Sequence, residues 1–167
     1  KICHDELSDL YMLCKDKRAE EQIGQCIDLH RKWLAMDDRF ERPHRDTTGY
    51  MMRAYAKMVY LRDLISRDKL NEYYQKCIGL ARARGDMAEI YSTSARYYQC
   101  TGDYERAVAY IDSTITAYKS KGIKADLAPI YATQSYLYEK MGDYKNALKA
   151  VRTTNNIRFN ERVEEAQ

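Results

Sequence analysis

The sequence predicts an all-α protein built from helical hairpins in tandem, and three observations carry the prediction. The chain of 167 residues has only seven glycines and two prolines, so long regular elements are expected. Apolar residues recur at intervals of three and four, the period of an amphipathic helix. Glycines punctuate the second half at helix-sized intervals of 17, 20 and 20 residues; they are Gly85, Gly102, Gly122 and Gly142.

The apolar period predicts eight helices along the chain. Their predicted ranges are 5–14, 17–36, 46–64, 68–84, 87–100, 104–121, 126–140, and 144–158 or beyond. Residues 37–45 are expected to form a loop, because Pro43 and a cluster of charges interrupt the period there. Helices on both sides of this loop still need a partner for their apolar faces, so we expect no domain boundary at it.

The corners between helices have a sequence signature. Three of the four glycines are followed by aspartate, which predicts a left-handed glycine ending one helix and an aspartate N-cap starting the next. Asp86 and Glu89 have the spacing of a capping box. Asp126 is expected to cap the helix that has Pro129 in its first turn, where the missing N–H of proline costs little.

An internal repeat of 40 residues is the strongest signal in the sequence. It aligns the Gly-Asp-Tyr corner at 102–104 with the corner at 142–144. The flanking residues match as well: Tyr91 with Tyr131, Tyr98 with Tyr138, Ala107 with Ala147, and Ile111 with Val151. Small residues, including Ala95 and Ser135, are expected where antiparallel helices cross, and the tyrosines are expected to fill the space between hairpins.

This pattern resembles the tetratricopeptide repeat family, most clearly in the segment YSTSARYYQCTGDYERAVAYIDSTI. The resemblance implies a right-handed superhelix of about four antiparallel helix pairs forming a single domain over 1–167. The expected pairs are 5–36, 46–84, 87–121 and 126–158, followed by a C-terminal tail at 159–167. The match is weaker in the first half, where Ile65 replaces the corner glycine and Leu70 replaces the alanine.

A superhelix of this kind implies a concave groove lined by the first helix of each pair, suited to a protein or peptide partner. We expect the groove to be lined by residues of these first helices that lie outside the packing positions. They are Tyr55, Val59, Arg62, Ser92, Arg96, Gln99, Ala132, Tyr136 and Glu139. Arg62 and Arg96 are the expected partners of a carboxylate. Self-association end to end is a further expectation.

Composition and motifs argue against several other functions. The 28 basic and 25 acidic residues give a net charge of only +3, so nucleic acid is not an expected partner. No apolar run is long enough for membrane insertion. His4, His30 and His44 lie far apart, and no nucleophile or phosphate-binding motif is present, so we expect no metal, cofactor or catalytic activity.

The five cysteines are odd in number and lack the close pairs of zinc or redox motifs. We expect most of them to be small buried hydrophobic residues. The alternative is that one pair, such as Cys14 with Cys26, is oxidised.

The elongated repeat units resemble the sensor regions that precede a membrane span and a histidine kinase or DNA-binding module in many Bacteroidetes regulators. That resemblance implies a ligand-sensing, periplasmic part of a bacterial signal-transduction protein. Since the sequence begins at Lys1 rather than Met, we expect it to be a piece of a longer protein. The alternatives are a freestanding cytosolic adaptor, and a helical accessory domain of an enzyme whose chemistry lies outside this chain.

Overall fold

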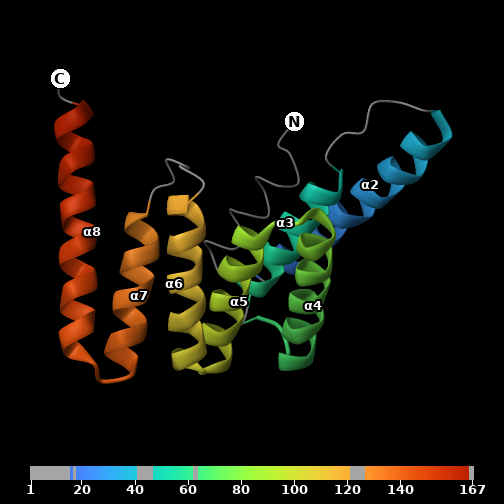
Figure 1. Ribbon diagram of the computed structural model, residues 1–167. Helices are drawn as coiled ribbons and strands as arrows, with labels where there is room; N and C mark the ends of the chain where they lie inside the picture. Colours follow the sequence, from blue (N-terminus) through green and yellow to red (C-terminus); the bar gives the residue numbers. More distant parts are fainter. Residues whose placement is uncertain (1–15, 17, 41–46, 62–63, 121–126, 166–167) are drawn as a thin grey trace. The chain divides into compact units, whose positions relative to one another are not determined.

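The computed structural model describes residues 16, 18–40, 47–61, 64–120 and 127–165, and within these it contains helices and no strands (Figure 1). The helices are α2 (Arg18–Phe40), α3 (Thr47–Val59), α4 (Arg67–Arg84), α5 (Met87–Thr101), α6 (Tyr104–Ser120), α7 (Ala128–Lys140) and α8 (Tyr144–Glu165). The all-α, tetratricopeptide-like prediction is therefore confirmed. The first predicted helix, 5–14, lies outside the described residues.

The chain divides into two compact units, residues 1–93 and 94–167, and the division falls inside α5. We call these unit 1 and unit 2. Each has its own hydrophobic core.

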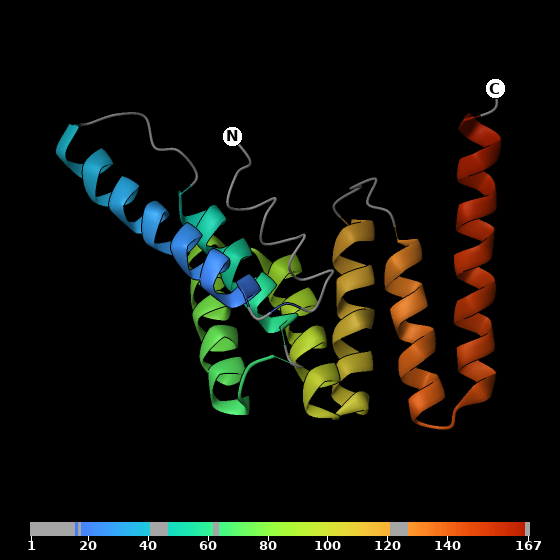
Figure 2. The same cartoon turned by 180° about the vertical axis from the view of Figure 1, so that it is seen from behind.

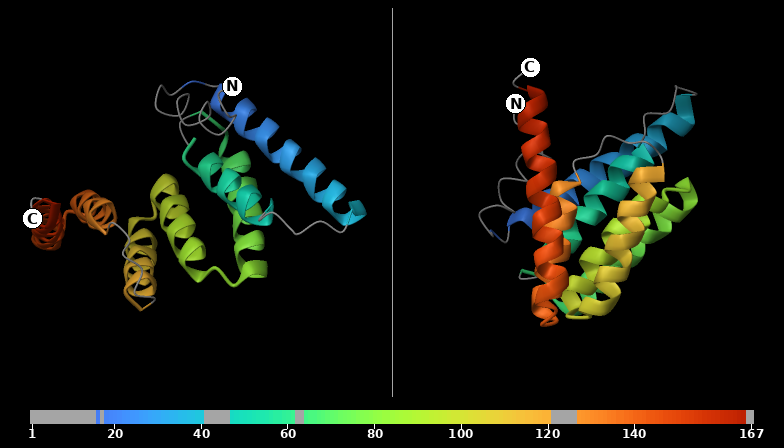
Figure 3. Two further views of the ribbon diagram at one scale, coloured as in Figure 1. Left: turned by 90° about the horizontal axis from the view of Figure 1, so that it is seen from above. Right: turned by 60° about the vertical axis from the view of Figure 1, so that its left-hand side comes forward.

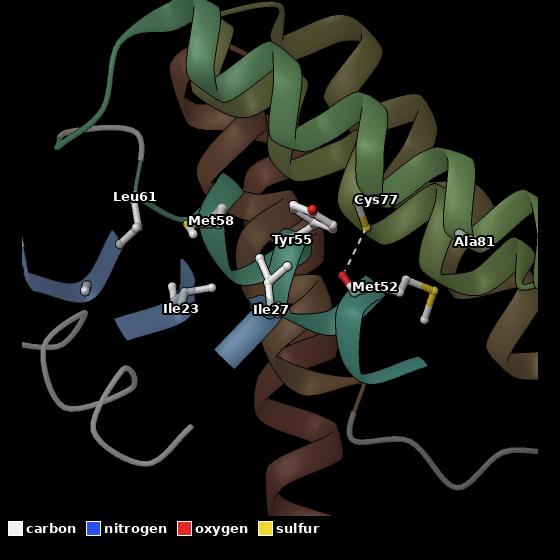
Figure 4. Packing of buried hydrophobic residues seen from close by; sticks show 10 residues of the cluster. Ile23, Ile27, Met52, Tyr55, Met58, Leu61, Cys77 and Ala81 are labelled. Carbon is white, nitrogen blue, oxygen red and sulfur yellow. Dashed lines mark hydrogen bonds between the residues drawn. The ribbon is translucent and has the colours of Figure 1, made fainter. Parts of the chain in front are cut away.

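Unit 1 is held together by α3, which packs against both α2 and α4 (Figure 2). Ile23 and Ile27 of α2 meet Met58 of α3 in the core, and Cys77 and Ala81 extend it along α4 (Figure 4). A polar contact ties the first and last of these helices together, because Glu20 Oε1 accepts hydrogen bonds from Lys69 Nζ at 2.6 Å and from Tyr73 OH at 2.9 Å.

The described cysteines behave as small core residues. Cys26 and Cys77 are buried free thiols, and Cys100 is a half-buried one. The Cys77 thiol donates to Met52 O at 3.5 Å, and burial raises its pKa to about 12. Cys3 and Cys14 lie outside the described residues.

In unit 2, α7 lies between α6 and α8 (Figure 3). Ala95, Ala107, Ile111 and Leu137 form its core with Val108 and Ile115. The small residues predicted for the helix crossings are buried, with Ala107 fully inaccessible and Ser135 and Ala147 below a tenth exposed. Tyr98 packs against the core and stacks on Tyr110, the ring centroids being 5.5 Å apart.

The three Gly-Asp corners share one geometry, as predicted. Each glycine is left-handed, with φ of +66° at Gly85, +84° at Gly102 and +77° at Gly142. In each corner the aspartate N–H donates to the carbonyl five residues back, which is the longer bond of a Schellman motif. The same aspartate then accepts from the backbone N–H three residues on, at 3.1 Å in all three corners. One residue thus ends one helix and caps the next.

The capping box is only half formed. Asp86 accepts from the Glu89 N–H, but the Glu89 carboxylate accepts from Thr93 Oγ1 at 2.6 Å instead of reaching back to Asp86. The Asp86 N–H is already used, because it donates to Ala81 O in the Schellman motif. The reciprocal bond therefore has no donor left.

Two helix ends differ from the prediction by four residues or more. Helix α2 runs on to Phe40, so residues 37–40 of the predicted loop 37–45 are helical, because charged residues do not end a solvated helix. It ends before Pro43. Helix α3 ends at Val59 instead of near 64. Helix α8 runs to Glu165, which the range of 144–158 or beyond allowed, so residues 159–165 of the expected tail are helical. The expected Asp126 cap lies outside the described residues; Leu127 occupies the N-cap of α7 without a side-chain hydrogen bond.

Candidate functional site

A cleft of about 300 Å³ opens in unit 2 where α6, α7 and α8 come together. We call it the α7–α8 cleft. Its lining is mixed, with tyrosine rings, amides, one carboxylate and one ammonium group. The lining residues are Asp112 from α6; Tyr131, Gln134 and Tyr138 from α7; and Asn146, Lys149, Ala150 and Thr153 from α8.

Helical spacing explains why these side chains converge. Tyr131, Gln134 and Tyr138 are three and four residues apart, so they share one face of α7. Lys149 and Thr153 are likewise one turn apart on α8. Ala150 is a buried lining residue with a side chain of one carbon, which leaves the longer neighbours room to surround a ligand.

Asp112 and Gln134, which both line the cleft, form a polar link between α6 and α7. Gln134 is 8% exposed, and its Nε2 donates to Asp112 Oδ1 at 2.6 Å. Asp112 is exposed as a whole residue, but its carboxyl group lies against α7, where burial raises its pKa and the Gln134 hydrogen bond partly offsets the rise. The carboxylate is thus fixed in position and favours a cationic or donor group beside it.

Asp143 and Asn146 fix the start of α8, and Asn146 also lines the cleft. The Asn146 backbone and side-chain N–H groups donate to Asp143 at 3.1 and 2.6 Å, and these bonds lower the Asp143 pKa. Nearby, burial raises the Tyr138 pKa, with further contributions from Asp112 and Asp143. Tyr138 therefore keeps its proton and presents a hydroxyl donor.

Tyr131, which lines the cleft, is held by a cation. Lys119 Nζ donates to Tyr131 OH at 3.1 Å and lies 5.8 Å from the ring centroid. The contact ties the end of α6 to the start of α7. On the α8 side, Lys149 is exposed and brings the only ammonium group among the lining residues.

In unit 1, the predicted groove residues are not on an open surface. Tyr55 and Val59 are 4% and 0% exposed. The Tyr55 ring stacks on Tyr73, and its hydroxyl accepts from Arg31 Nη2 at 2.8 Å. Ser92 is half-buried and donates to the Glu89 carbonyl in its own helix. Arg62 lies outside the described residues.

In unit 2, the other predicted groove residues lie apart from the cleft. Gln99 is buried, and its Oε1 accepts a hydrogen bond from Arg96 Nη1 at 3.0 Å. Tyr136 and Glu139 are exposed on α7, where Lys140 Nζ lies 5.3 Å from the Tyr136 ring centroid, and Ala132 beside them is half-buried. None of these residues lines the cleft.

Sequence reasoning missed the lining of the α7–α8 cleft. Tyr131 and Tyr138 were assigned to packing, which they do perform against the unit 2 core. The missed signal is a polar residue, Gln134, at a position that faces a neighbouring helix. A buried amide needs a partner, so it predicts a polar group opposite, here Asp112.

Within the described part of the chain, no three His, Cys, Asp or Glu side chains come together as metal ligands. His30 lies in α2, while His4 and His44 fall outside the described residues. None of the described helices combines the length and the apolar character needed to cross a bilayer.

Comparison with protein families finds a match for one repeat unit of the chain. Residues 128–153 match the model described as Tetratricopeptide repeat. The matched segment contains α7 and the first half of α8, so it includes seven of the eight residues that line the cleft. No curated protein matches the sequence. The described hairpins and the match together support a tetratricopeptide-type helical repeat, a fold that indicates a protein-interaction scaffold.

Proposed function

We propose that the chain binds a peptide segment of a partner protein in the α7–α8 cleft. The observation that carries this proposal is the coincidence of the cleft with the recognisable repeat, since α7 and α8 supply all of its lining except Asp112. Repeats of this class bind other proteins through their surfaces. The cleft is a concave site on one such repeat, the one formed by α7 and α8.

The chemistry of the cleft favours a peptide over an apolar ligand. A peptide backbone offers N–H donors and carbonyl acceptors in alternation, and the cleft provides groups for both. Asp112 accepts at one side, while Asn146 and Lys149 donate at the other. The tyrosine rings supply apolar contact area between these polar groups.

Selection from a displayed peptide library tests this proposal. We expect selected peptides to bind the wild-type chain and to lose about tenfold or more in affinity for the Lys149→Glu variant, since a charge-assisted hydrogen bond is replaced by repulsion. Tyr136→Ala is the matched control on the predicted groove face of α7. Binding that survives Lys149→Glu and is lost in Tyr136→Ala would assign the site to that groove instead.

We further propose that the chain is the ligand-sensing, extracytoplasmic region of a bacterial signal-transduction protein, either a histidine kinase or a transcriptional regulator. Repeat units of 40 residues, longer than the usual 34, support this, as does the long helix α8 that ends the described chain. A rigid helix leaving the repeat is a suitable route for transmitting a change in geometry. The proposal assigns no catalytic step to these residues.

A reporter that is active only after export tests the location. Fused after Gln167 in the natural protein, it is expected to be active if the chain lies outside the cytoplasm. Inactivity of this fusion, together with activity of a matched cytoplasmic reporter, would favour the cytosolic adaptor.

A further inference from the structure

Asp112 brings a negative charge to the α7–α8 cleft, and a neutral group holds this charge in place. Its Oδ1 accepts a hydrogen bond from Gln134 Nε2 at 2.6 Å. No salt bridge joins Asp112 to a lysine or arginine in the part of the chain that the structure describes. Burial raises the pKa of its carboxyl group, and only the Gln134 hydrogen bond acts against that rise. A cation supplied by a ligand would therefore be stabilised beside Asp112.

The two nearby ammonium groups of unit 2 are placed elsewhere. Lys119 Nζ donates to Tyr131 OH at 3.1 Å, at the end of α6. Lys149 lines the cleft from α8, whereas Asp112 belongs to α6, and α7 packs against both of these helices. Neither lysine pairs with Asp112 in the described structure. The chain thus presents the carboxylate without its own counter-ion.

The lining around Asp112 matches the hydrogen-bonding needs of an ammonium group. Such a group has three N–H donors and no acceptor. The cleft offers the Asp112 carboxylate, the amide oxygen of Gln134, whose Nε2 is already used, and the hydroxyl oxygen of Tyr138. Asp112 lies close enough to Tyr138 that its charge contributes to the raised Tyr138 pKa. There is thus one acceptor for each N–H.

The size and the apolar part of the cleft fit a single long side chain. Its volume of about 300 Å³ is at the lower limit of small-molecule pockets, which span about 300–1,000 Å³. The rings of Tyr131 and Tyr138 and the methyl group of Ala150 supply contact area for an aliphatic stem. A lysine side chain combines such a stem with a terminal ammonium group.

We propose that the α7–α8 cleft is a lysine subsite, in which a lysine side chain of the bound peptide places its ammonium group on Asp112. The proposal rests on the proposed function, because the lysine belongs to the peptide bound there. Arginine fits less well, since its planar fork uses both carboxylate oxygens and Gln134 already holds Oδ1. An N-terminal amine fits less well too, because it has no aliphatic stem to lie between the tyrosines.

NMR titration of the full chain with four small probes tests the subsite. The first probe is Nα-acetyl-lysine methylamide, and the second is its norleucine counterpart, which lacks only the ammonium group. The third is the arginine counterpart, and the fourth is alanine methylamide, whose cation is an α-amino group. We expect the lysine probe to shift the Asp112, Gln134 and Tyr138 amide signals saturably. The norleucine probe should bind about tenfold more weakly, since it makes no charge-assisted hydrogen bond.

Three variants assign the binding to Asp112. Asp112→Asn removes the charge but keeps an oxygen that accepts from Gln134, and we expect it to weaken the lysine probe about tenfold. Glu105→Gln is the matched control, because Glu105 is exposed on the same helix and does not line the cleft. Lys149→Glu, which should weaken a selected peptide, is expected to bind the lysine probe at least as tightly as wild type. Circular dichroism checks that each variant keeps its helices.

The outcomes separate this proposal from the proposed function. Equal binding of the lysine and norleucine probes, or no saturable shift with lysine, overturns the lysine subsite. Tighter binding of the arginine or alanine probe, or equal losses in Asp112→Asn and Glu105→Gln, overturns it as well. Selected peptides that bind in a manner sensitive to Lys149→Glu would in those cases leave the peptide site standing. A lysine probe that binds through Asp112, with no peptide selected, would support the subsite and contradict the peptide site.

Discussion

Gln134 Nε2 donates to Asp112 Oδ1 at 2.6 Å and thereby joins α7 to α6 through two residues that line the α7–α8 cleft. The bond forms between a buried amide and a carboxylate whose pKa burial has raised. It serves the packing of unit 2 and also places an acceptor in the candidate site.

Loss of this bond is expected to destabilise unit 2. Gln134→Ala removes the donor and leaves the Asp112 carboxylate against α7 without it, at a cost of about 1–2 kcal/mol in the free energy of unfolding. Thr116→Ala is the control, because Thr116 is exposed on α6 and its hydroxyl bonds only within the helix, to the Asp112 carbonyl. Urea unfolding measures both. Equal stability of the two variants would contradict a structural role for the bond.

The corner glycines are expected to be needed for their backbone conformation alone. Gly142 has φ of +77°, and a Cβ there would meet no atom within 4 Å. Gly142→Ala should therefore lower stability by about 1–2 kcal/mol, the cost of the left-handed conformation for a residue with a side chain.

Gly79→Ala is the matched control for that variant. Gly79 lies inside α4, and a Cβ there would also meet no atom within 4 Å. Because alanine favours the helix, this change should raise stability by about 0.5–1 kcal/mol. Thermal unfolding of the two variants should therefore shift in opposite directions. A shift in the same direction would contradict a left-handed conformation at Gly142.

Glu89 is expected to weaken unit 1 at neutral pH. Burial raises its pKa, although the Thr93 hydrogen bond and the charge of Arg53 act in the opposite direction. The folded state then binds a proton more readily than the unfolded state, so the stability linked to Glu89 falls as the pH rises through the raised pKa. Glu89→Gln should therefore melt higher than wild type at pH 7. The gap should close as the pH falls below the usual carboxyl value of 4.5.

Glu20, also in unit 1, has a lowered pKa and is therefore expected to stabilise the unit at neutral pH. Partial burial acts to raise its pKa, but the hydrogen bonds from Lys69 and Tyr73 outweigh it and the pKa is lowered. The ionised form is thus favoured by folding, and its contribution is lost only as the pH falls through the lowered pKa. Glu20→Gln should melt lower than wild type at pH 7, with no difference in strong acid. A pH-independent difference would exclude the ionised group as its cause.

The sequence predicted the second half of the fold better than the first, for a physical reason. Gly102 and Gly142 mark corners that need a left-handed backbone conformation, so the helix ends at these two corners were predicted to within one residue. The corner between α3 and α4 has no such glycine. There Leu64 N–H bonds to Leu61 O, and Ser66 caps α4 by accepting from the Lys69 N–H. A turn built from ordinary residues leaves little trace in the sequence.

The groove residues were predicted as those that lie off the expected packing positions, but some of these residues are buried in the structure. Tyr55 was placed in the groove because it lies off the main packing stripe of α3. In the structure its ring stacks on Tyr73 of α4, and Lys76 Nζ lies 5.6 Å from the ring centroid. A helix packed on two sides, as α3 is between α2 and α4, buries more than one stripe. Periodicity within one helix cannot show how many neighbours the helix has.

The most direct test of the binding proposal is residue-level mapping by NMR. Backbone amide shifts would be recorded while a peptide selected against the wild-type chain is added. We predict that the largest changes fall on Asn146, Lys149 and Thr153, and that Lys149→Glu abolishes them. Changes confined to Ala132, Tyr136 and Glu139 on the other face of α7, or no saturable change in unit 2, would contradict the account.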